Sequence, residues 1–472
     1  MKPLFEILKE YTQSDIYPFH MPGGKRNPAL NQTGLPYCYD ITEIEGFDDL
    51  HQPNQQGPVR DLEKRASKLY GSDATALLVN GSTAGIISGI MACTKKGDEI
   101  LVARNCHKAV YHGIFLNELQ ARYLYPHYNK ETDLNESISL LQIEQALETY
   151  PNVKAVLITS PTFDGVVSDI KAISACVHQK GIPLIVDEAH GAHFGFHEAF
   201  PLNGLAFGAD IVIHSLHKTL PSLTQTALIH GQGTRVDWER VGFYLQMFQS
   251  SSPSYILMAS IDVCLSMLEN QTKREQLFSA YTRLLIDTRK ELKKLKNLCL
   301  IETEHFDISK ILISVKGTRE SGLSLYQKLL EQYHLQMEMA AGSYVLAMTS
   351  ICDRPAGMER LVKALQAIDA SMCREKTNLL LPVDFQFPKL KSRYNIFRVR
   401  NQTEGFISVP FAHCQGHISA EFAYLYPPGI PLVVPGEVIN QRAAELLGQY
   451  AKIGFSIAGL KKTDEILVYM GK

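Results

Sequence analysis

Residues 211–231 read IVIHSLHKTLPSLTQTALIHG, and the upstream residues 183–191 read PLIVDEAHG. Each contains a run of apolar, largely β-branched residues, which is typical of a strand buried on both faces of a parallel sheet. Polar groups come directly after: Asp187 ends one run, and Ser215 ends the other, with Lys218 on the short loop beyond it. Because open α/β sheets place ligand groups beyond the carboxyl ends of their strands, these segments predict an α/β fold with a site at that edge.

The same alternation extends on both sides of these segments. From about residue 60 onward, short runs rich in Val, Ile and Leu alternate with segments of helical periodicity, which predicts a large, mostly parallel sheet covered by helices. A second, smaller alternation begins near residue 304. The sequence therefore predicts four parts: an N-terminal arm (1–58), a large domain (59–265), a small α/β domain (266–375) and a C-terminal domain (376–472), the last entered through a connector from residue 376 to 392.

Composition and charge exclude several classes of protein. The chain has 472 residues, of which 47 are Lys or Arg and 49 are Asp or Glu, and this balance argues against a nucleic-acid partner. The opening residues alternate apolar and charged side chains, unlike a signal peptide, and no uncharged apolar run reaches the length of a membrane span. The nine cysteines include no C-x-x-C pair, which predicts reduced thiols in a cytoplasmic protein with no membrane partner.

A lysine and an acid carry the first half of a cofactor prediction. Pyridoxal 5'-phosphate (PLP) requires a lysine, an acid at its pyridine nitrogen, a phosphate cradle and a group against its ring. Lys218 has Ser215 and His217 beside it, and both can donate to a phosphate. Asp187 ends an apolar strand, where a carboxylate is costly without a partner. A protonated pyridine nitrogen about 4 Å away would attract it by roughly 4 kcal/mol at an effective dielectric near 20.

Simpler interpretations of both segments remain open. Lys218 alone could be a surface lysine in a turn. The segment that contains Asp187 could instead be a metal site, because Asp187, Glu188, His190 and His193 are all of metal-ligand types. Lys218, on the loop after the next expected strand, favours the PLP interpretation over the metal.

The segment NGSTAG (80–85) is the candidate phosphate cradle. It lies between an expected strand and an expected helix, so Ser82, Thr83 and the free backbone N–H groups of the helix start would face a phosphate. An ordinary helix cap is the alternative. His107, at the start of the next expected helix, would stack on the pyridine ring, although a capping role is the simpler reading. The order of the four features is more specific than any one of them.

These segments resemble the prokaryotic ornithine/lysine/arginine decarboxylases, which are PLP enzymes of the aspartate-aminotransferase fold (fold type I). The resemblance covers about residues 19 to 440, and the length is that of the short form. It rests on FHMPGGK, TEIEGFDDLHQP, NGST, RNCHKAV, SPTFDG, VDEAHGAHF, SLHKTLPSLTQ and YPPGIPLVVPGE. It implies that Lys218 forms the Schiff base, that Asp187 binds the pyridine nitrogen and that His107 stacks on the ring. The implied cofactor-binding set also includes Ser82, Thr83, His190, Ser215 and His217.

The resemblance also implies an activity and an assembly. The expected reaction is decarboxylation of a basic L-amino acid in polyamine metabolism, with arginine placed slightly ahead of lysine and ornithine. Family members are homodimers or larger, with active sites at the subunit interface, and the segment 250–255 is expected near the neighbouring subunit's phosphate. Another fold type I reaction, such as transamination or aldol cleavage, and a PLP-binding homologue without turnover are the alternatives.

One carboxylate is expected to recognise the cationic end of the substrate. Glu437 in PGE is the first candidate, because a buried carboxylate is costly until a cation binds it. The arm residues Glu43, Asp48 and Asp49 are weaker candidates, and a solvated surface position is the alternative for all four carboxylates. Two departures from the family pattern bear on the substrate pocket: Gly24 replaces a histidine in PGGK, and residues 413–417 read HCQGH where the family has E-A-x-G-R.

Overall fold

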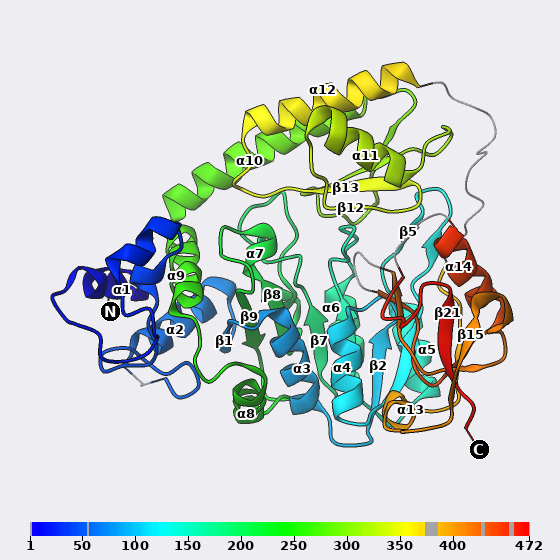
Figure 1. The fold of residues 1–472 in the computed structure, drawn as a ribbon, viewed down its shortest axis with the longest axis horizontal. Helices are drawn as coiled ribbons and strands as arrows, with labels where there is room; N and C mark the ends of the chain where they lie inside the picture. Colours follow the sequence, from blue (N-terminus) through cyan, green and yellow to red (C-terminus); the bar gives the residue numbers. More distant parts are fainter. Residues whose placement is uncertain (1, 54–55, 373–385, 426–429, 453–456, 472) are drawn as a thin grey trace. The chain divides into compact units, whose positions relative to one another are not determined.

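The computed structural model describes residues 2–53, 56–372, 386–425, 430–452 and 457–471 (Figure 1). The chain forms two compact units, which are described separately below. Unit 1 comprises Met1–Cys93, Ile170–Thr282 and Ser350–Cys352, and unit 2 comprises Thr94–Asp169, Arg283–Thr349 and Asp353–Lys472.

Unit 1 holds four strands of a large mixed sheet, in the order β1, β9, β8, β7. Strands β7 and β8 are parallel, whereas β9 runs antiparallel to both β8 and β1. The strands are β1 (Ala74–Leu78), β7 (Leu184–Asp187), β8 (Ile211–Ser215) and β9 (Ala227–Gly231). The helices are α1 (Leu4–Gln13), α2 (Pro58–Tyr70), α3 (Gly81–Cys93), α6 (Ile170–Gln179), α7 (Leu216–Thr219), α8 (Trp238–Phe248) and α9 (Tyr255–Glu269).

Helix α3 packs closely on the strands that precede the candidate site. Its sequence, GSTAGIISGIMAC, contains no charged residue and most of its side chains are buried. It contacts β1, β8 and β9. A Cβ added at Gly85 would lie 2.6 Å from Cδ1 of Leu78, so glycine at this position lets the helix approach the sheet.

Unit 2 holds three parallel strands, in the order β6, β2, β3, and a separate four-stranded antiparallel sheet in the order β10, β11, β13, β12. The first group consists of β2 (Glu99–Ala103), β3 (Gln120–Leu124) and β6 (Val153–Thr159), with α4 (Lys108–Leu116) and α5 (Leu140–Thr149). The second consists of β10 (Cys299–Ile301), β11 (Lys310–Ser314), β12 (Met339–Ala340) and β13 (Tyr344–Met348), with α11 (Gly322–Tyr333) and α12 (Pro355–Ser371). Helix α10 (Gln271–Leu292) begins in unit 1 and ends in unit 2.

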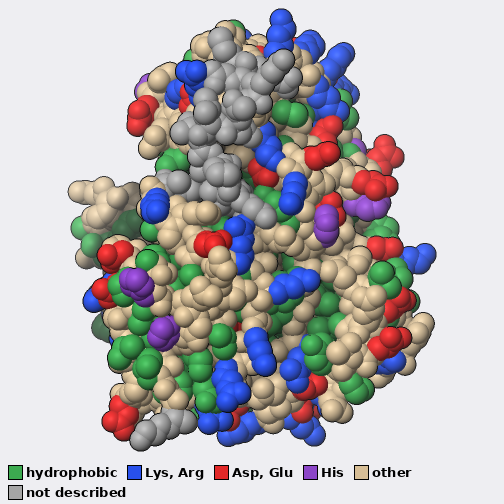
Figure 2. All heavy atoms as spheres, turned by 90° about the vertical axis from the view of Figure 1, so that its right-hand side faces the viewer, with side chains coloured by type: hydrophobic (Ala, Val, Ile, Leu, Met, Phe, Trp, Pro, Cys, Tyr) green, Lys and Arg blue, Asp and Glu red, His purple; other side chains and the backbone are tan. Residues whose placement is uncertain are grey.

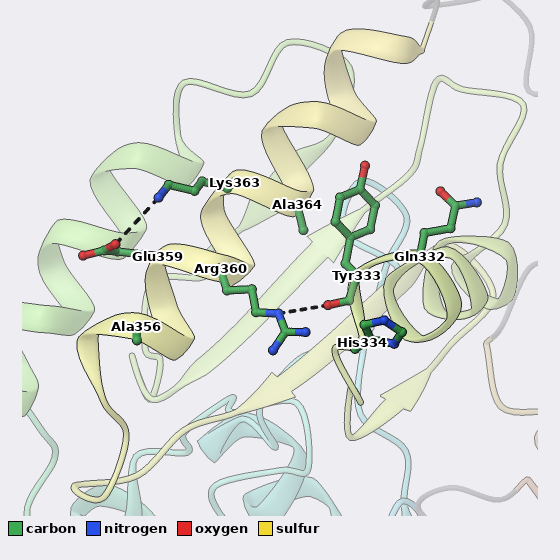
Figure 3. A pocket seen from close by; sticks show the side chains of 8 residues that line it. All are labelled: Gln332, Tyr333, His334, Ala356, Glu359, Arg360, Lys363 and Ala364. Atoms are coloured by element: carbon green, nitrogen blue, oxygen red, sulfur yellow. Dashed lines mark hydrogen bonds and ion pairs between the residues drawn. The ribbon is translucent and has the colours of Figure 1, made fainter.

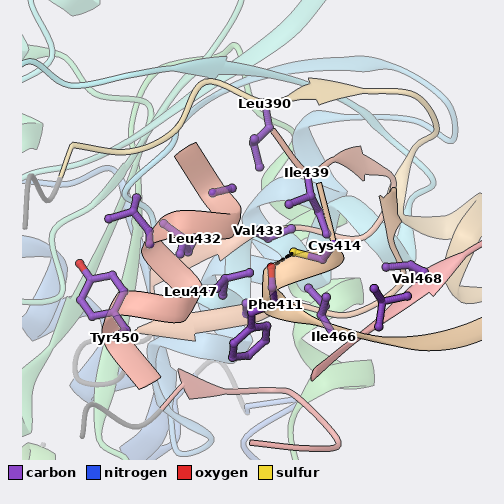
Figure 4. Close-up of a cluster of buried hydrophobic side chains, with 14 residues drawn as sticks. Leu390, Phe411, Cys414, Leu432, Val433, Ile439, Leu447, Tyr450, Ile466 and Val468 are labelled. Atoms are coloured by element: carbon purple, nitrogen blue, oxygen red, sulfur yellow. Dashed lines mark hydrogen bonds between the residues drawn. The ribbon is translucent and has the colours of Figure 1, made fainter. Parts of the chain in front are cut away.

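The C-terminal part of unit 2 has its own core (Figure 4). Two small sheets have the strand orders β14-β19-β16-β21-β15 and β18-β17-β20. Helix α14 (Gln441–Lys452) supplies apolar side chains to this core, among them Leu446 and Leu447. The remaining elements are α13 (Ile396–Arg400), β14 (Lys391–Ser392), β15 (Phe406–Pro410), β16 (Ile418–Ser419), β17 (Ala423–Leu425), β18 (Ile430–Val433), β19 (Glu437–Val438), β20 (Ile457–Ala458) and β21 (Glu465–Tyr469).

The structure confirms the expected fold class, an α/β fold with a mostly parallel large sheet and further α/β and C-terminal parts. The four-part division of the chain stays a prediction, because the compact units are not continuous segments. The expected connector lies partly outside the described residues. None of the described helices is both long enough and apolar enough to cross a membrane. Figure 2 shows Lys and Arg side chains together with Asp and Glu side chains on one face of the molecule.

Candidate active site

Lys218 lies directly beyond the carboxyl end of β8, in unit 1. The sequence predicted a loop at this point, but the chain forms the one-turn helix α7, which leaves Lys218 half-buried. Its Nζ lies 3.1 Å from Nε2 of His190. The lysine and a histidine of the DEAHG segment are therefore in hydrogen-bond contact.

Asp187 is the last residue of β7, and only 3% of it is exposed. Its Oδ1 accepts a hydrogen bond from the backbone N–H of Ala189 at 3.2 Å. Burial raises the pKa of Asp187, and the positive charge of Lys218 partly opposes this rise. A buried acid of this kind gains most from a second cation, and a protonated ring nitrogen would supply one.

The candidate phosphate cradle brings two hydroxyl groups together. Oγ of Ser82, at the start of α3, lies 2.5 Å from Oγ of Ser215, at the end of β8. Gly81 has a positive φ of 72°, and its N–H donates to the carbonyl of Gln225 at 2.9 Å, which fixes the turn before the helix. Thr83 is exposed beside Ser82. Hydroxyls and helix N–H groups form a donor set that suits a phosphate.

His217 is held by a backbone contact. Its Nδ1 donates to the carbonyl oxygen of Thr226 at 2.9 Å, so a neutral ring would have an unprotonated Nε2. Burial lowers the pKa of His217, the contact with Thr226 opposes this change, and Lys218 adds to it. His217 can therefore donate to a phosphate from Nε2 only after that anion has favoured protonation of the ring.

His107 belongs to unit 2, where it precedes α4. Its Nδ1 accepts a hydrogen bond from the N–H of Ala109 at 3.2 Å, so it caps the helix. The neutral ring then carries its proton on Nε2. The capping role is thus observed, and the stacking role stays a prediction.

Glu437 has a cationic partner within unit 2, Arg104, and its expected role in recognising the substrate stays a prediction. Its Oε2 lies 3.2 Å from Nη2 of Arg104, and the two side chains are 1% and 0% exposed. Arg104 also donates to the hydroxyl of Tyr111 at 2.7 Å and to the carbonyl of Pro431 at 2.8 Å. Burial opposes the charge of Arg104, yet Glu437 and neighbouring tyrosines hold the pKa of the guanidinium well above its usual range. The pair joins the RNCHKAV turn to the PGE segment.

The weaker substrate candidates lie in the arm, and two of them hold backbone N–H groups. Asp48 accepts from the N–H of Val59 at 3.0 Å, at the start of α2, and Asp49 accepts from the N–H of His51 at 2.8 Å. Oε1 of Glu43 is buried with no hydrogen-bond partner among the described residues. Of the three, Glu43 is the carboxylate that retains a buried oxygen without a partner.

The two departures from the family pattern fall in different units: Gly24 in unit 1 and the HCQGH segment in unit 2. A Cβ at Gly24 would lie 3.3 Å from the ring of Tyr37. In the HCQGH segment, Cys414 is buried and His413 is exposed. Their effect on the substrate pocket stays a prediction.

A metal site was the alternative interpretation of the segment that contains Asp187. Among the described residues, no group of three or more His, Cys, Asp and Glu side chains is arranged to hold a metal ion.

A hollow of about 510 Å³ is lined by residues of α11 and α12. Figure 3 shows these side chains, among them Arg360, whose Nε donates to the carbonyl of Tyr333 at 3.0 Å. That hollow is lined by none of the predicted site residues.

Two buried ion pairs, one in each unit, were missed from the sequence. One is Arg104 with Glu437, and the other is Glu188 with His214 at 2.7 Å. Arg104 directly follows the apolar run EILVA, which was a usable sign of a buried cation. The contact between Glu188 and His214 follows from the parallel register of β7 and β8, in which Asp187 is opposite Ile213 and the residues that follow these two are Glu188 and His214.

The donor set of unit 1 fits PLP. It offers an amine, a buried acid and a pair of hydroxyls at a helix start, and comparison with known proteins agrees. Residues 2–330 match the family model "Orn/Lys/Arg decarboxylase, major domain", and residues 392–458 match "Orn/Lys/Arg decarboxylase, C-terminal domain".

Individual relatives cover nearly the whole chain. The chain is 33% identical to the uncharacterized protein YaaO of Bacillus subtilis, over 99% of this chain and 98% of that one. It is 30% identical to the arginine decarboxylase of the same organism, over 97% and 95%. The lysine decarboxylase LdcF of Francisella novicida has the same fold, with a TM-score of 0.84 at 20% identity, over 99% of this chain and 81% of that one. The chain therefore belongs to the Orn/Lys/Arg decarboxylase family and is a PLP-dependent amino-acid decarboxylase of fold type I.

Proposed function

We propose that this enzyme decarboxylates a basic L-amino acid, with arginine ahead of lysine and ornithine, and holds PLP as a Schiff base on Lys218. The observation that carries the proposal is the arrangement in unit 1, where Lys218 contacts His190 and its charge acts on the buried Asp187. The hydroxyls of Ser82, at the start of α3, and Ser215, at the end of β8, lie 2.5 Å apart.

Each residue then has a defined task. When bound, the cofactor supplies an electron sink for the pair of electrons left by the departing carboxylate. Asp187 would bind the protonated ring nitrogen, and the hydroxyls of Ser82 and Ser215 would bind the phosphate. Lys218 would anchor the cofactor through its Nζ, and the same amine in its free form would be able to move a proton to the substrate's Cα. His190 holds the Nζ of Lys218 at hydrogen-bond distance and so orients it.

The relatives support arginine ahead of lysine. The arginine decarboxylases of Bacillus subtilis and Bacillus anthracis are 30% and 28% identical, each over 97% of this chain. The lysine decarboxylase LdcA of Pseudomonas aeruginosa is 26% identical over 60% of this chain.

The first prediction concerns the substrate. We expect the purified holoenzyme to release carbon dioxide and the corresponding amine in equal amounts from arginine, and more slowly from lysine and ornithine. Mass spectrometry of the products together with trapping of labelled carbon dioxide measures both. Formation of a 2-oxo acid without carbon dioxide would instead identify a transaminase, and bound cofactor without any product would identify a homologue without turnover.

We propose further that the enzyme is a homodimer or larger, in a reducing cytoplasm. The arm exposes large apolar side chains, with Phe19 at 90% and Tyr17 at 67% exposed, and a second subunit would cover them. The eight cysteines that the structure describes are all free, which supports a reducing compartment. These assignments rest on surface and thiol chemistry.

The second prediction concerns Glu437. Because its carboxylate already binds Arg104, we expect Glu437→Gln to leave a buried guanidinium without its counter-charge. Breaking a buried pair in this way costs about 3 kcal/mol or more, which should lower the thermal unfolding midpoint by several degrees. KM for arginine should change by less than about threefold, as for residues that do not bind substrate.

Glu445→Gln is the matched control, because Glu445 is an exposed carboxylate on α14 in the same domain. It should leave both the midpoint and KM unchanged. If Glu437→Gln instead keeps its midpoint and raises KM strongly for arginine, then Glu437 recognises the substrate after all.

A further inference from the structure

Two buried carboxylates, each paired with a histidine, link the parallel strands β7 and β8 at their opposite ends. At the amino end, Nε2 of His178 lies 2.8 Å from Oδ2 of Asp210, and the same oxygen accepts from the N–H of Leu184, the first residue of β7. At the carboxyl end, Nε2 of His214 lies 2.7 Å from Oε2 of Glu188. The two pairs have the same chemistry and nearly the same length, but only the second lies at the cofactor end.

The pair at the carboxyl end is completely enclosed. His214 is 0% and Glu188 is 2% exposed. The Glu188 carboxylate also accepts from the N–H of Gly204, with its two oxygens at 3.1 and 3.2 Å. Burial raises the pKa of Glu188, and His214 and the Gly204 contact oppose this rise. The carboxylate is thus held from two directions.

Strand geometry places this pair on the opposite face from the cofactor groups. Successive side chains of a strand point to opposite faces, and Asp187 faces Ile213 in the register. Asp187, Ile213 and Ser215 therefore share one face, which is the face covered by α3, because a Cβ at Gly85 would lie 3.5 Å from Ile213. Glu188 follows Asp187, and His214 lies between Ile213 and Ser215. Both side chains therefore point to the other face, away from the proposed cofactor site.

The ring of His214 packs against the rings of neighbouring aromatic residues. The ring of Tyr70 lies 4.8 Å from the ring of His214 and 4.8 Å from that of His230. Nδ1 of His230 in turn lies 2.7 Å from Oγ1 of Thr75, and the Tyr70 hydroxyl donates to the carbonyl of Ala192 at 2.8 Å. These contacts leave His214 little freedom to rotate.

We infer that Glu188 and His214 are positioning residues that fix the carboxyl ends of β7 and β8, and through them the placement of Asp187 and Lys218 against the cofactor. Asp187 is adjacent to Glu188 in the chain, and Ser215 is adjacent to His214. The hydrogen bond between Glu188 and His214 therefore sets the spacing between Asp187 and Ser215. The inference rests on the proposed roles of Asp187 and Lys218. Neither positioning residue touches the cofactor in this scheme.

The test compares Glu188→Gln with the matched variant Asp210→Asn. Both replace a buried carboxylate with a neutral amide of nearly the same shape. Each leaves a histidine without its carboxylate partner: His214 on β8 in the first variant and His178 on α6 in the second. Both should lower the thermal midpoint of the apoprotein by a similar amount. The charges that surround Glu188 differ from those around Asp210, since His193 and His214 act on Glu188 and Arg235 and His178 on Asp210.

Cofactor binding distinguishes the two variants. We expect Glu188→Gln to raise the dissociation constant for PLP, followed by the visible absorption of the protein-bound cofactor, by about tenfold or more, and to lower kcat by ten- to a hundredfold at saturating cofactor. Asp210→Asn should keep both values within about twofold of wild type. His214→Gln should reproduce Glu188→Gln, and the double variant should add little, because the residues act as one unit.

If Glu188→Gln and Asp210→Asn change cofactor affinity and kcat equally, the pair is only structural and the inference is wrong. If Glu188→Gln fails to fold, His214→Gln decides by the same measurements. Reductive labelling of Lys218 in the wild type separates this failure from that of the proposed function, because labelling would still succeed if only the positioning role were wrong.

Discussion

The Lys218→Ala enzyme should be colourless after purification and should decarboxylate arginine at least about a thousandfold more slowly than the wild type. Without the Nζ, no covalent bond to the cofactor can form, and the group proposed to return the proton to Cα is also lost. Each such acid–base role contributes about 10²- to 10⁴-fold. The measurements are the visible absorption of the dialysed protein and kcat at saturating arginine and PLP.

Borohydride reduction of the wild type gives the decisive control. Reduction should fix the cofactor on a single peptide that contains Lys218, and mass spectrometry should find it there. Lys171→Ala, which removes an exposed lysine of α6 in the same unit, should retain colour and activity. Label on another lysine, or a coloured and active Lys218→Ala enzyme, would show that Lys218 is not the anchor.

The strand ends of the large sheet could be predicted because their sequence signals are local. The apolar runs LIV before Asp187 and IVI before His214 and Ser215 are uninterrupted, and the structure forms β7 and β8 there. The helix expected after NGSTAG from about Thr83 is also present, and it begins two residues earlier, at Gly81. In each case neighbouring residues carry the whole signal, so a single sequence suffices.

The contacts that define Glu437 could not be predicted, because they join residues far apart in the chain. The sequence showed a carboxylate in a loop stiffened by Pro and Gly, but not Arg104, 333 residues earlier, as its partner. A buried carboxylate is stabilised by a cation, and in this fold Arg104 is one such cation for Glu437. The one-turn helix that carries Lys218 was missed for a related reason. Four residues are too few for a periodic signal.

The Asp187→Asn enzyme should bind PLP and keep its colour but lose most of its activity. Asparagine has nearly the same shape and can still accept the N–H of Ala189, so the turn after β7 should persist. It cannot keep a ring nitrogen protonated, because the charge that attracts the proton is gone. That attraction is about 4 kcal/mol for charges 4 Å apart at an effective dielectric near 20, and each 1.36 kcal/mol is tenfold in rate. We therefore expect kcat to fall by up to about a thousandfold.

The control for this loss is Asp237→Asn, in which an exposed carboxylate that caps α8 becomes an equally good cap. Asp237→Asn should leave kcat unchanged. A fall in kcat seen only for Asp187→Asn would then result from losing the negative charge proposed to lie beside the ring nitrogen, and not from a general effect of replacing Asp with Asn. Burial raises the pKa of Asp187 in the apoprotein, so binding of a protonated ring should favour the ionised carboxylate and release a proton. Calorimetry in buffers of different ionisation enthalpy would detect this proton for the wild type, and the asparagine variant should release less. An Asp187→Asn enzyme with kcat within a few-fold of wild type would show that another group holds the ring nitrogen, and the assignment of this strand end would have to change.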